Sequence, residues 1–177
     1  LQLNALAKKL RDTRMNEGSI SFDRVEVRFK LDEHGDPDGV YFKEQKDAHK
    51  LIEDFMLLAN RSVTLYVSKL DRKDKTFVYR IHDDPDPDKI SAFSQFISRF
   101  GYNVDGNRVQ SSLNRVLGAV KGKPEANVVE TLAIRTMSKA VYTTKNIGHY
   151  GLGFSHYSHF TSPIRRYPDV MTHRLLW

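Results

Sequence analysis

The feature that most constrains the fold is a long helical pattern of apolar residues that begins after Asp47. Apolar side chains recur at helical spacing and, around residues 55–59, occupy most of the helix circumference. They are Leu51, Ile52, Phe55, Met56, Leu58, Ala59 and Val63. A helix that is apolar on nearly every side is normally buried. We therefore expect one long central helix against which the rest of the chain packs.

Weaker patterns on either side of this helix predict further helices and short strands. Alternating apolar residues over 20–31, a turn over 32–39 and an apolar return over 40–42 predict a β-hairpin. A strand is expected over 77–82, and helical spacing predicts helices over 3–16, 90–100, 109–120 and 125–137. The sequence thus predicts a single α+β unit that is helix-rich in its second half.

Near the end of the chain, Thr161-Ser162-Pro163 is a strong helix-start signal. Serine is a preferred N-cap, and proline is favoured at the first helical position. Arg165 and Arg166 then fall in the first turn, where free backbone N–H groups and the helix dipole already attract an anion. Two cations there destabilise the helix unless something negative binds, so we predict an anion site.

This last helix is expected to pack on a core beside an aromatic segment. Its apolar stripe consists of Ile164, Tyr167, Met171 and Leu175. The preceding residues, 149–160, are rich in glycine, histidine and aromatic rings. An anion site beside aromatic rings is the arrangement that recognition of phosphates and bases requires.

Two stretches carry a resemblance to a known family. Residues 161–169 read TSPIRRYPD, preceded by YGLGF at 150–154 and followed by HR at 173–174, and residues 52–60 read IEDFMLLAN. Together they closely resemble the catalytic (RNB) domain of the ribonuclease II / ribonuclease R family, over nearly the whole chain. The resemblance implies a processive 3′→5′ exoribonuclease that degrades single-stranded RNA from its 3′ end to nucleoside 5′-monophosphates.

The resemblance is greatest to the C-terminal part of such a domain, in a ribonuclease R-like protein. The chain begins at Leu1 and ends at Trp177 inside what look like helices. We therefore expect residues 1–177 to be one partial RNB domain that is cut at both ends.

The resemblance gives the two arginines roles at the RNA backbone. Arg165 matches the family's catalytic arginine, and a guanidinium can hold two phosphate oxygens at once. The alternative for Arg165 is an ion pair with Asp169, four residues further along the same helix face. Arg166 is implied either to contact phosphate or to be solvated.

Four further residues are implied to bind RNA, each with an alternative role. Glu53 matches a residue that contacts ribose hydroxyls, a contact that distinguishes RNA from DNA, but the pattern alone makes it the exposed edge of a helix. Asn60 lies either near the nucleotide or in the core as a polar partner. Phe22 matches an aromatic that stacks on the terminal base, and Tyr150 also offers a stacking ring, but the pattern alone makes Phe22 a core residue and aromatics in extended segments such as Tyr150 are usually core as well.

The acidic residues of the segment 83–88 are tempting metal ligands, but two prolines and a following helix favour capping roles instead. The family resemblance implies Mg²⁺ in the parent enzyme, yet no aspartate cluster like the family's occurs between Leu1 and His149. An acidic position that the family carries after the arginine helix is also missing. We therefore expect this chain alone to be inactive and to hold no metal; the alternative is a non-catalytic RNA-binding module on an RNB framework.

Composition supports a nucleic-acid partner only weakly. The net charge is +6 and the isoelectric point is near 9.5, which favours a polyanion. The absence of cysteine excludes disulfides and thiolate metal sites and fits a cytoplasmic protein. No apolar run approaches the roughly 20 residues of a membrane span. No obligate protein partner is indicated.

Overall fold

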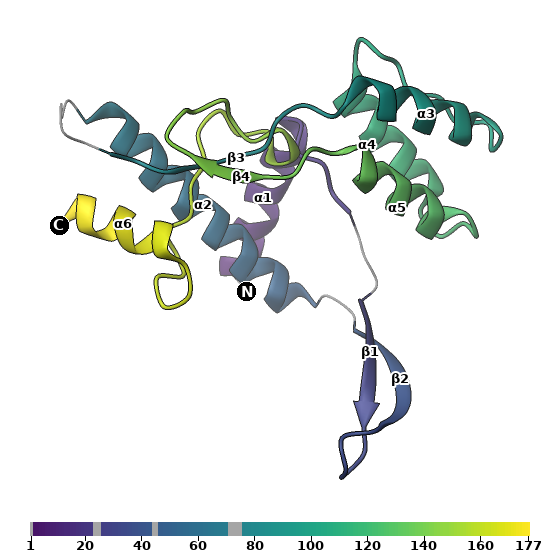
Figure 1. The fold of residues 1–177 in the computed structure, drawn as a ribbon, viewed down its shortest axis with the longest axis horizontal. Helices are drawn as coiled ribbons and strands as arrows, with labels where there is room; N and C mark the ends of the chain where they lie inside the picture. Colours follow the sequence, from purple (N-terminus) through teal and green to yellow (C-terminus); the bar gives the residue numbers. More distant parts are fainter. Residues whose placement is uncertain (1, 23–25, 44–45, 71–75) are drawn as a thin grey trace.

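The structure, a computed structural model, describes residues 2–22, 26–43, 46–70 and 76–177 and has the predicted α+β class (Figure 1). The helices are α1 (Gln2–Asn16), α2 (Asp47–Lys69), α3 (Pro87–Ser98), α4 (Val109–Val120), α5 (Ala126–Thr136) and α6 (Tyr167–Leu176). The strands are β1 (Glu26–Leu31), β2 (Pro37–Lys43), β3 (Tyr79–Ile81) and β4 (Val141–Thr143). They form two separate antiparallel pairs, β1–β2 and β3–β4.

The long helix α2 is held against α1 by a buried ion pair. The Asp54 side chain is only 2% exposed, and its carboxylate receives the Arg11 guanidinium at 2.6 Å and the Arg14 guanidinium at 3.0 Å. Each arginine bonds a different carboxylate oxygen, so both oxygens are satisfied. Because charge-assisted bonds are the strong ones, this pair fixes how α2 is rotated about its axis.

The prediction that α2 is buried on most sides was wrong. Three of its four buried residues are polar, namely Asp54, Asn60 and Thr64, and Ile52 is 58% exposed. Among the apolar residues of α2, only Val67 is fully buried, and the helix contacts its neighbours largely through ion pairs and hydrogen bonds. No helix in the described part of the chain is long and apolar enough to cross a membrane.

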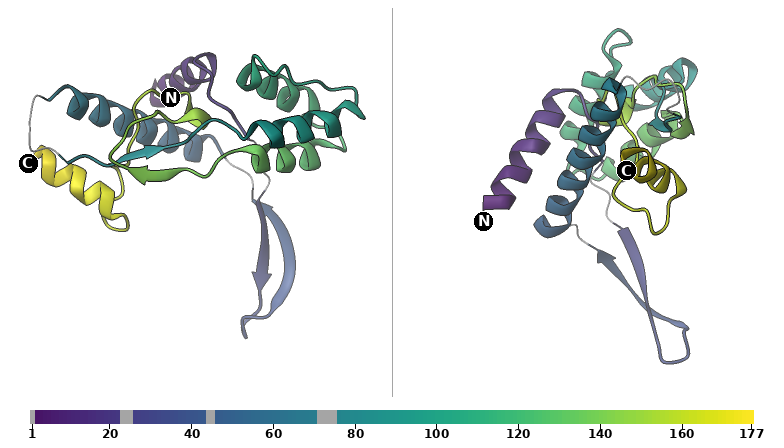
Figure 2. Two further views of the ribbon diagram at one scale, coloured as in Figure 1. Left: turned by 45° about the horizontal axis from the view of Figure 1, so that its top comes forward. Right: turned by 90° about the vertical axis from the view of Figure 1, so that its left-hand side faces the viewer.

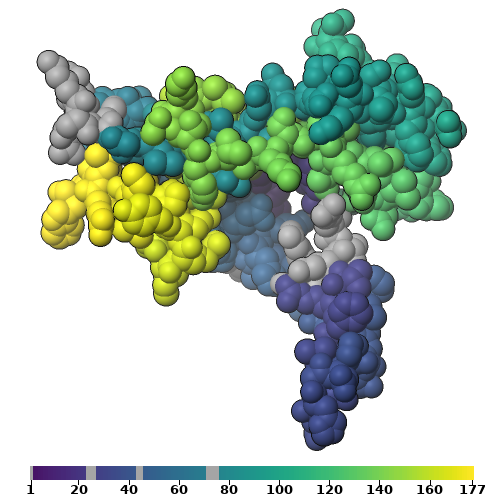
Figure 3. Space-filling view, in the orientation of Figure 1, coloured from purple at the N-terminus to yellow at the C-terminus, as the bar shows by residue number. Residues whose placement is uncertain are grey.

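The helices α3, α4 and α5 form a group at one end of the molecule, opposite α6 (Figures 1 and 3). They enclose the main apolar core, which includes Phe93, Ile97, Leu113, Val116, Val120 and Val129. Ile20 also packs there and is not part of a strand, although the sequence predicted one over 20–31; β1 is described over Glu26–Leu31. The predicted cap of α3 is confirmed, because the Asp86 carboxylate accepts hydrogen bonds from the backbone N–H groups of Asp88 and Lys89.

The β1–β2 hairpin projects away from the helices (Figure 2). Val27 pairs with Phe42 and Phe29 with Val40, and all four side chains are at least half exposed. The predicted hairpin is therefore confirmed, but its apolar residues are not covered by any other described element. The residues 23–25 that lead into it lie outside the described part of the chain.

The β3–β4 pair lies between the three-helix group and the α2–α6 end of the molecule (Figure 1). The segment 149–160 runs along it. The backbone N–H of Tyr150 donates to the His82 carbonyl at 2.8 Å, and the Arg80 N–H donates to the Tyr157 carbonyl at 2.9 Å. These bonds fix the aromatic segment before it reaches the turn that carries the arginines.

The predicted start of the last helix was wrong. We expected Ser162 as its N-cap, but α6 begins at Tyr167, and residues 163–165 form a turn. Pro168 explains the difference. Proline lacks an N–H and clashes with the carbonyl four residues earlier, so it is tolerated only in the first turn of a helix. A helix that began at Pro163 would have placed Pro168 in its interior.

The predicted apolar stripe of this helix was also wrong at its first two positions. Ile164 is 96% exposed and Tyr167 is 66% exposed, whereas Met171 and Leu175 are half-buried. The fully buried side chains of α6 are Asp169 and Thr172. Thr172 Oγ1 donates to the His159 carbonyl at 3.4 Å, and His173 Nε2 lies 2.9 Å from the Phe160 carbonyl, so polar contacts join α6 to the preceding segment.

The Asp54 ion pair gives a stability prediction. Asp54→Ala leaves two arginines without their partner, which costs several kcal/mol when the site is fully buried. Because Arg11 and Arg14 are partly exposed, we expect the free energy of unfolding in urea to fall by about 2–3 kcal/mol. Asp12→Ala, at an exposed position of α1, is the control and should change it by less than about 0.5 kcal/mol. An equal loss in both variants would contradict the role of the ion pair.

Candidate functional site

A pocket of about 500 Å³ lies between α2 and the segment that leads into α6. It brings together three of the predicted RNA-binding residues, Glu53, Asn60 and Arg166. Its other lining residues are Ala48, His49, Ile52, Met56, Leu57 and Tyr157. The floor is therefore one face of α2, and the opposite wall comes from residues about a hundred positions later in the sequence.

Helix geometry explains which α2 residues face this pocket. Residues three and four apart share a face, as do His49, Glu53, Met56 and Asn60. Asp54, the neighbour of Glu53, is turned toward α1. Our sequence analysis missed His49 and Met56, although their spacing from Glu53 would have identified them. Glu53 itself is exposed and has no ion-pair partner among the described residues.

Asn60 joins the two walls of the pocket. Its amide nitrogen donates to the Tyr157 hydroxyl at 3.1 Å, and its carbonyl oxygen accepts the N–H groups of Phe160 at 2.9 Å and Thr161 at 3.2 Å. The side chain is buried, so these bonds form away from water. Asn60 is therefore a buried polar partner at the edge of the pocket, and its role close to a nucleotide remains a prediction.

Arg166 is locked in place by Asp169. The carboxylate of Asp169 is completely buried; its Oδ1 accepts a hydrogen bond from Arg166 Nη2 at 2.9 Å, and its Oδ2 lies 2.9 Å from Arg166 Nε as an ion pair. Oδ1 also accepts the Ser162 N–H at 2.7 Å. Asp169 thus closes the turn 162–166 and holds Arg166 at the pocket wall.

Arg165 is left exposed on the same turn. The alternative that it pairs with Asp169 was wrong, because Arg166 occupies that carboxylate. Arg165 does not line the pocket. Its backbone N–H donates to the Ser162 carbonyl oxygen at 3.3 Å, so the turn fixes its main chain. The structure thus separates two adjacent arginines into one that is ion-paired and one that faces solvent.

The surroundings of His159 show that this region is positively charged. Burial, then Arg166, and to a smaller extent Arg80 and Arg165 together lower the pKa of His159 to about 4, although Asp169 acts in the opposite direction. The Tyr142 hydroxyl and His159 Nδ1 are 2.6 Å apart, and the Arg80 guanidinium lies 4.6 Å from the centre of the Tyr142 ring. Three arginines therefore act on one neutral imidazole.

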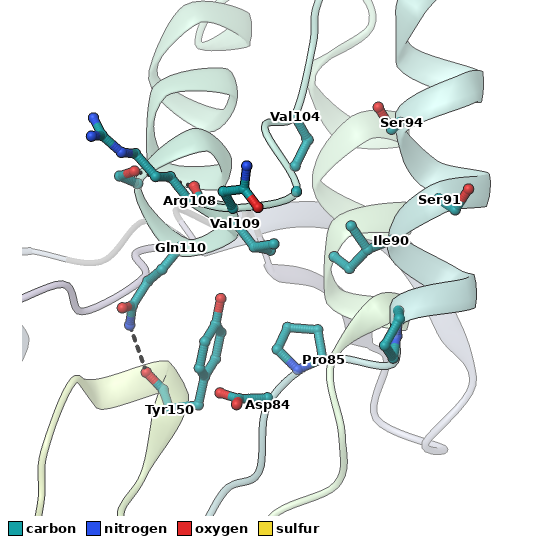
Figure 4. Close-up of a pocket in the computed structure, with 14 residues that line it drawn as sticks. Asp84, Pro85, Ile90, Ser91, Ser94, Val104, Arg108, Val109, Gln110 and Tyr150 are labelled. Atoms are coloured by element: carbon teal, nitrogen blue, oxygen red, sulfur yellow. Dashed lines mark hydrogen bonds between the residues drawn. The ribbon is translucent and has the colours of Figure 1, made fainter.

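Two predicted residues lie away from this pocket. Phe22 is half-buried against the core of the three-helix group, which fits the core alternative, and Tyr150 lines a different pocket (Figure 4). Their RNA-binding roles remain predictions. Among the described residues, no three histidine, aspartate or glutamate side chains are close enough together to hold a metal ion.

The whole chain, residues 1–177, matches the RNB domain family, so the chain belongs to that family. Ribonuclease R of Aquifex aeolicus is 38% identical over 98% of this chain, and ribonuclease R of Escherichia coli is 35% identical over 99% of it. The chain spans only 24% and 21% of these two relatives. It therefore corresponds to about a quarter of their length.

Solved structures show the same fold. Ribonuclease R of Mycoplasma genitalium, in complex with ribose-methylated single-stranded RNA, matches with a TM-score of 0.88 and 29% identity, over 99% of this chain and 27% of its own. Yeast Ssd1, described as a pseudonuclease, matches with a TM-score of 0.60 and 27% identity, over 75% of this chain and 17% of its own.

Asn60 provides a test of how the pocket is held together. Asn60→Leu leaves the N–H groups of Phe160 and Thr161 without their acceptor, so the free energy of unfolding should fall by about 2–4 kcal/mol. Urea denaturation measures this change. Asn127→Leu, on the exposed face of α5, should alter it by no more than about 0.5 kcal/mol. A stable Asn60→Leu variant would show that the two walls are held by other contacts.

Two half-buried histidines, His149 and His159, predict a pH dependence of stability. Burial is the main cause that lowers the pKa of His149 and of His159 from 6.5 to about 4. Below pH 6.5 the unfolded chain takes up protons that the folded chain refuses until about pH 4. The free energy of unfolding should therefore be highest above pH 6.5 and decrease steadily toward pH 4.

Urea unfolding measured across this range tests the prediction. His149→Gln should reduce the slope of stability against pH, since one of the two titrations is removed. His34→Gln, in the exposed turn of the hairpin, is the control and should leave the slope as it is. A wild-type curve that is flat between neutral and acidic pH would contradict the assignment.

Proposed function

We propose that this chain forms part of the active site of a processive exoribonuclease that degrades single-stranded RNA from its 3′ end to nucleoside 5′-monophosphates. The observation that carries the proposal is the turn 162–166. There Arg166 is ion-paired to the buried Asp169, and Arg165 is exposed on the same fixed backbone. The ribonuclease R relatives and the RNA-bound ribonuclease R of M. genitalium support RNA as the partner.

In this proposal Arg165 is the catalytic arginine. Cleavage of a phosphodiester builds negative charge on the phosphate oxygens, and a cation held in place before the reaction stabilises that charge without reorganisation cost. A guanidinium can hold two of these oxygens. Arg166 reaches the same phosphates only with the donors that Asp169 leaves free, so its larger contribution is to position the turn.

Glu53 is proposed to read the sugar. Its carboxylate lies at the pocket between α2 and Tyr157 and is not used in an ion pair within the described chain. A free carboxylate accepts hydrogen bonds from the 2′ and 3′ hydroxyls of a terminal ribose. The 2′ hydroxyl exists only in RNA, so this contact would select RNA over DNA.

Hydrolysis in this scheme requires Mg²⁺, and the described residues of this chain do not fit such a site. Asp86 caps α3, Asp54 and Asp169 are ion-paired, and no three candidate ligands converge. We therefore propose that acidic residues outside this chain hold the metal and that residues 1–177 alone do not hydrolyse RNA. A cytoplasmic location also remains a prediction.

The alternative is a non-catalytic RNA-binding module on the same framework. The similarity to yeast Ssd1, described as a pseudonuclease, favours keeping this reading, since that protein shares the fold. In that case Arg165 would contribute to affinity for the RNA backbone but there would be no turnover. The two functions are separated by whether mononucleotides are released.

The decisive experiment measures mononucleotide release from a 3′-tailed RNA by a longer polypeptide that adds the family's acidic cluster upstream of this chain. Arg165→Ala should lower turnover by about a hundredfold or more while RNA affinity changes little, as expected for a lost electrostatic stabiliser. Arg174→Ala removes an exposed arginine from the last turn of α6 and should leave turnover unchanged.

Each outcome has a definite meaning. Unchanged turnover in Arg165→Ala would overturn the catalytic role of that residue. RNA binding by the wild-type polypeptide without release of mononucleotides would favour the non-catalytic module. Release by the isolated chain of residues 1–177 would show that the metal site lies within this chain after all.

A further inference from the structure

A second and larger pocket, of about 770 Å³, lies where Tyr150 meets the three-helix group (Figure 4). It is built from the segment 84–87, from one side of α3, from the loop 104–108 and the first turn of α4, and from Tyr150. None of its lining residues belongs to the pocket that contains Glu53 and Arg166. Its volume falls within the roughly 300–1,000 Å³ typical of small-ligand sites.

The chemistry of its lining is that of a pocket for a flat molecule with polar edges. The walls include the apolar side chains of Pro85, Ile90, Val104 and Val109 together with the ring of Tyr150. About half of the lining residues are polar, and they include Asp84, Ser94 and Gln110. Apolar and aromatic walls combined with polar groups that fix orientation are usual for sites that bind small molecules or single groups of larger ones.

Tyr150 is rigidly held except at its hydroxyl. Its backbone N–H donates to the His82 carbonyl at 2.8 Å, and its carbonyl accepts from Gln110 at 3.0 Å. The Tyr150 and His82 rings meet edge to face at 6.2 Å. The hydroxyl, in contrast, is buried and has no hydrogen-bond partner among the described residues. A buried hydroxyl without a partner is costly, so its position indicates a ligand group that it would bond.

The charges around the pocket restrict what that ligand can be. Burial, and to a smaller extent Asp84, raise the pKa of Tyr150 to about 12, so the hydroxyl stays protonated and is able to donate. The Asp84 carboxylate accepts hydrogen bonds only. The Arg108 guanidinium is exposed and extends away from Tyr150 and Asp84 in Figure 4. The interior thus suits an uncharged group with N–H donors, and the rim offers a cation for a phosphate.

We propose that this pocket binds one unpaired base of an RNA strand, and that it prefers a base with an exocyclic amino group. The faces of the base would pack against Tyr150 and the apolar wall, and the amino group would donate to Asp84. Aromatic rings stack well on any base, whereas hydrogen bonds at the base edge select among bases. Cytosine carries an amino group where uracil carries a carbonyl oxygen, so cytosine should be preferred. The inference rests on the proposed function in that RNA supplies the base.

The test compares the affinities of the full chain for fluorescently labelled oligocytidylate and oligouridylate of equal length. The readout is the ratio of the two affinities, because general electrostatic changes alter both alike. Wild type should favour oligocytidylate. Asp84→Ala should reduce this preference by about fivefold or more, on the scale of one hydrogen bond to a charged group. Asp88→Ala removes the same charge from the first turn of α3 but does not line the pocket, so it should leave the ratio unchanged.

A second pair of variants fills the pocket. Ser94→Phe places a ring in the cavity from α3 and should weaken binding of both RNAs, whereas Gln95→Phe, on the exposed side of the same helix, should not. Circular dichroism and thermal unfolding confirm that each variant is folded. Should Ser94→Phe be unfolded, Tyr150→Phe, which removes only the hydroxyl, takes its place and should weaken binding of both RNAs.

The outcomes separate the inference from the proposed function. If Asp84→Ala and Ser94→Phe bind both RNAs like wild type, the pocket takes no base, even when Arg165→Ala still lowers turnover. If Ser94→Phe alters thermal stability but binds both RNAs with the affinity of wild type, the new ring affects only the packing of the protein, and the inference is overturned. If wild type binds neither RNA, the inference fails together with RNA recognition by this chain.

Discussion

The side-chain amide of Asn60 is the contact on which the candidate site depends. It bonds Tyr157 and two successive backbone N–H groups at 160–161, so it ties the middle of α2 to the turn that carries the arginines. Asn60 and Tyr157 are buried and the two N–H groups are partly buried, and a buried donor without an acceptor is costly. Asn60 thus helps to set the relative position of Glu53 and Arg166, together with the Asp169 carboxylate that holds Arg166.

The sequence predicted the elements of this fold better than the way they are held together. Periodicity located α4 to the residue, and the Asp86 cap and the hairpin were also found, because each depends on local chemistry. The start of α6 was wrong because a strong local signal at Ser162 was weighed without the proline six residues later. The burial of α2 was wrong because periodicity counts apolar residues but cannot show which polar residue will meet a partner 40 or 100 positions away.

The candidate site was only partly predictable for the same reason. Glu53, Asn60 and Arg166 were identified from a family motif and do meet at one pocket, although they come from two distant segments. His49 and Met56 have no motif and were missed, yet helical spacing from Glu53 places them there. The orphaned hydroxyl of Tyr150 could not have been foreseen, because whether a tyrosine finds a partner depends on every element that packs around it.

Two pairs of neighbouring like charges show how the fold divides structural from functional work. In the pair Glu53–Asp54, the aspartate is buried against two arginines of α1 and the glutamate is exposed at the pocket. In the pair Arg165–Arg166, the second arginine is bound to a buried aspartate and the first is exposed. Adjacent side chains on a helix or a tight turn point in different directions, so one can anchor the backbone while the other stays free. An exposed charge on a flexible chain would lose entropy on binding its ligand; next to an anchored neighbour, much of that cost is met during folding.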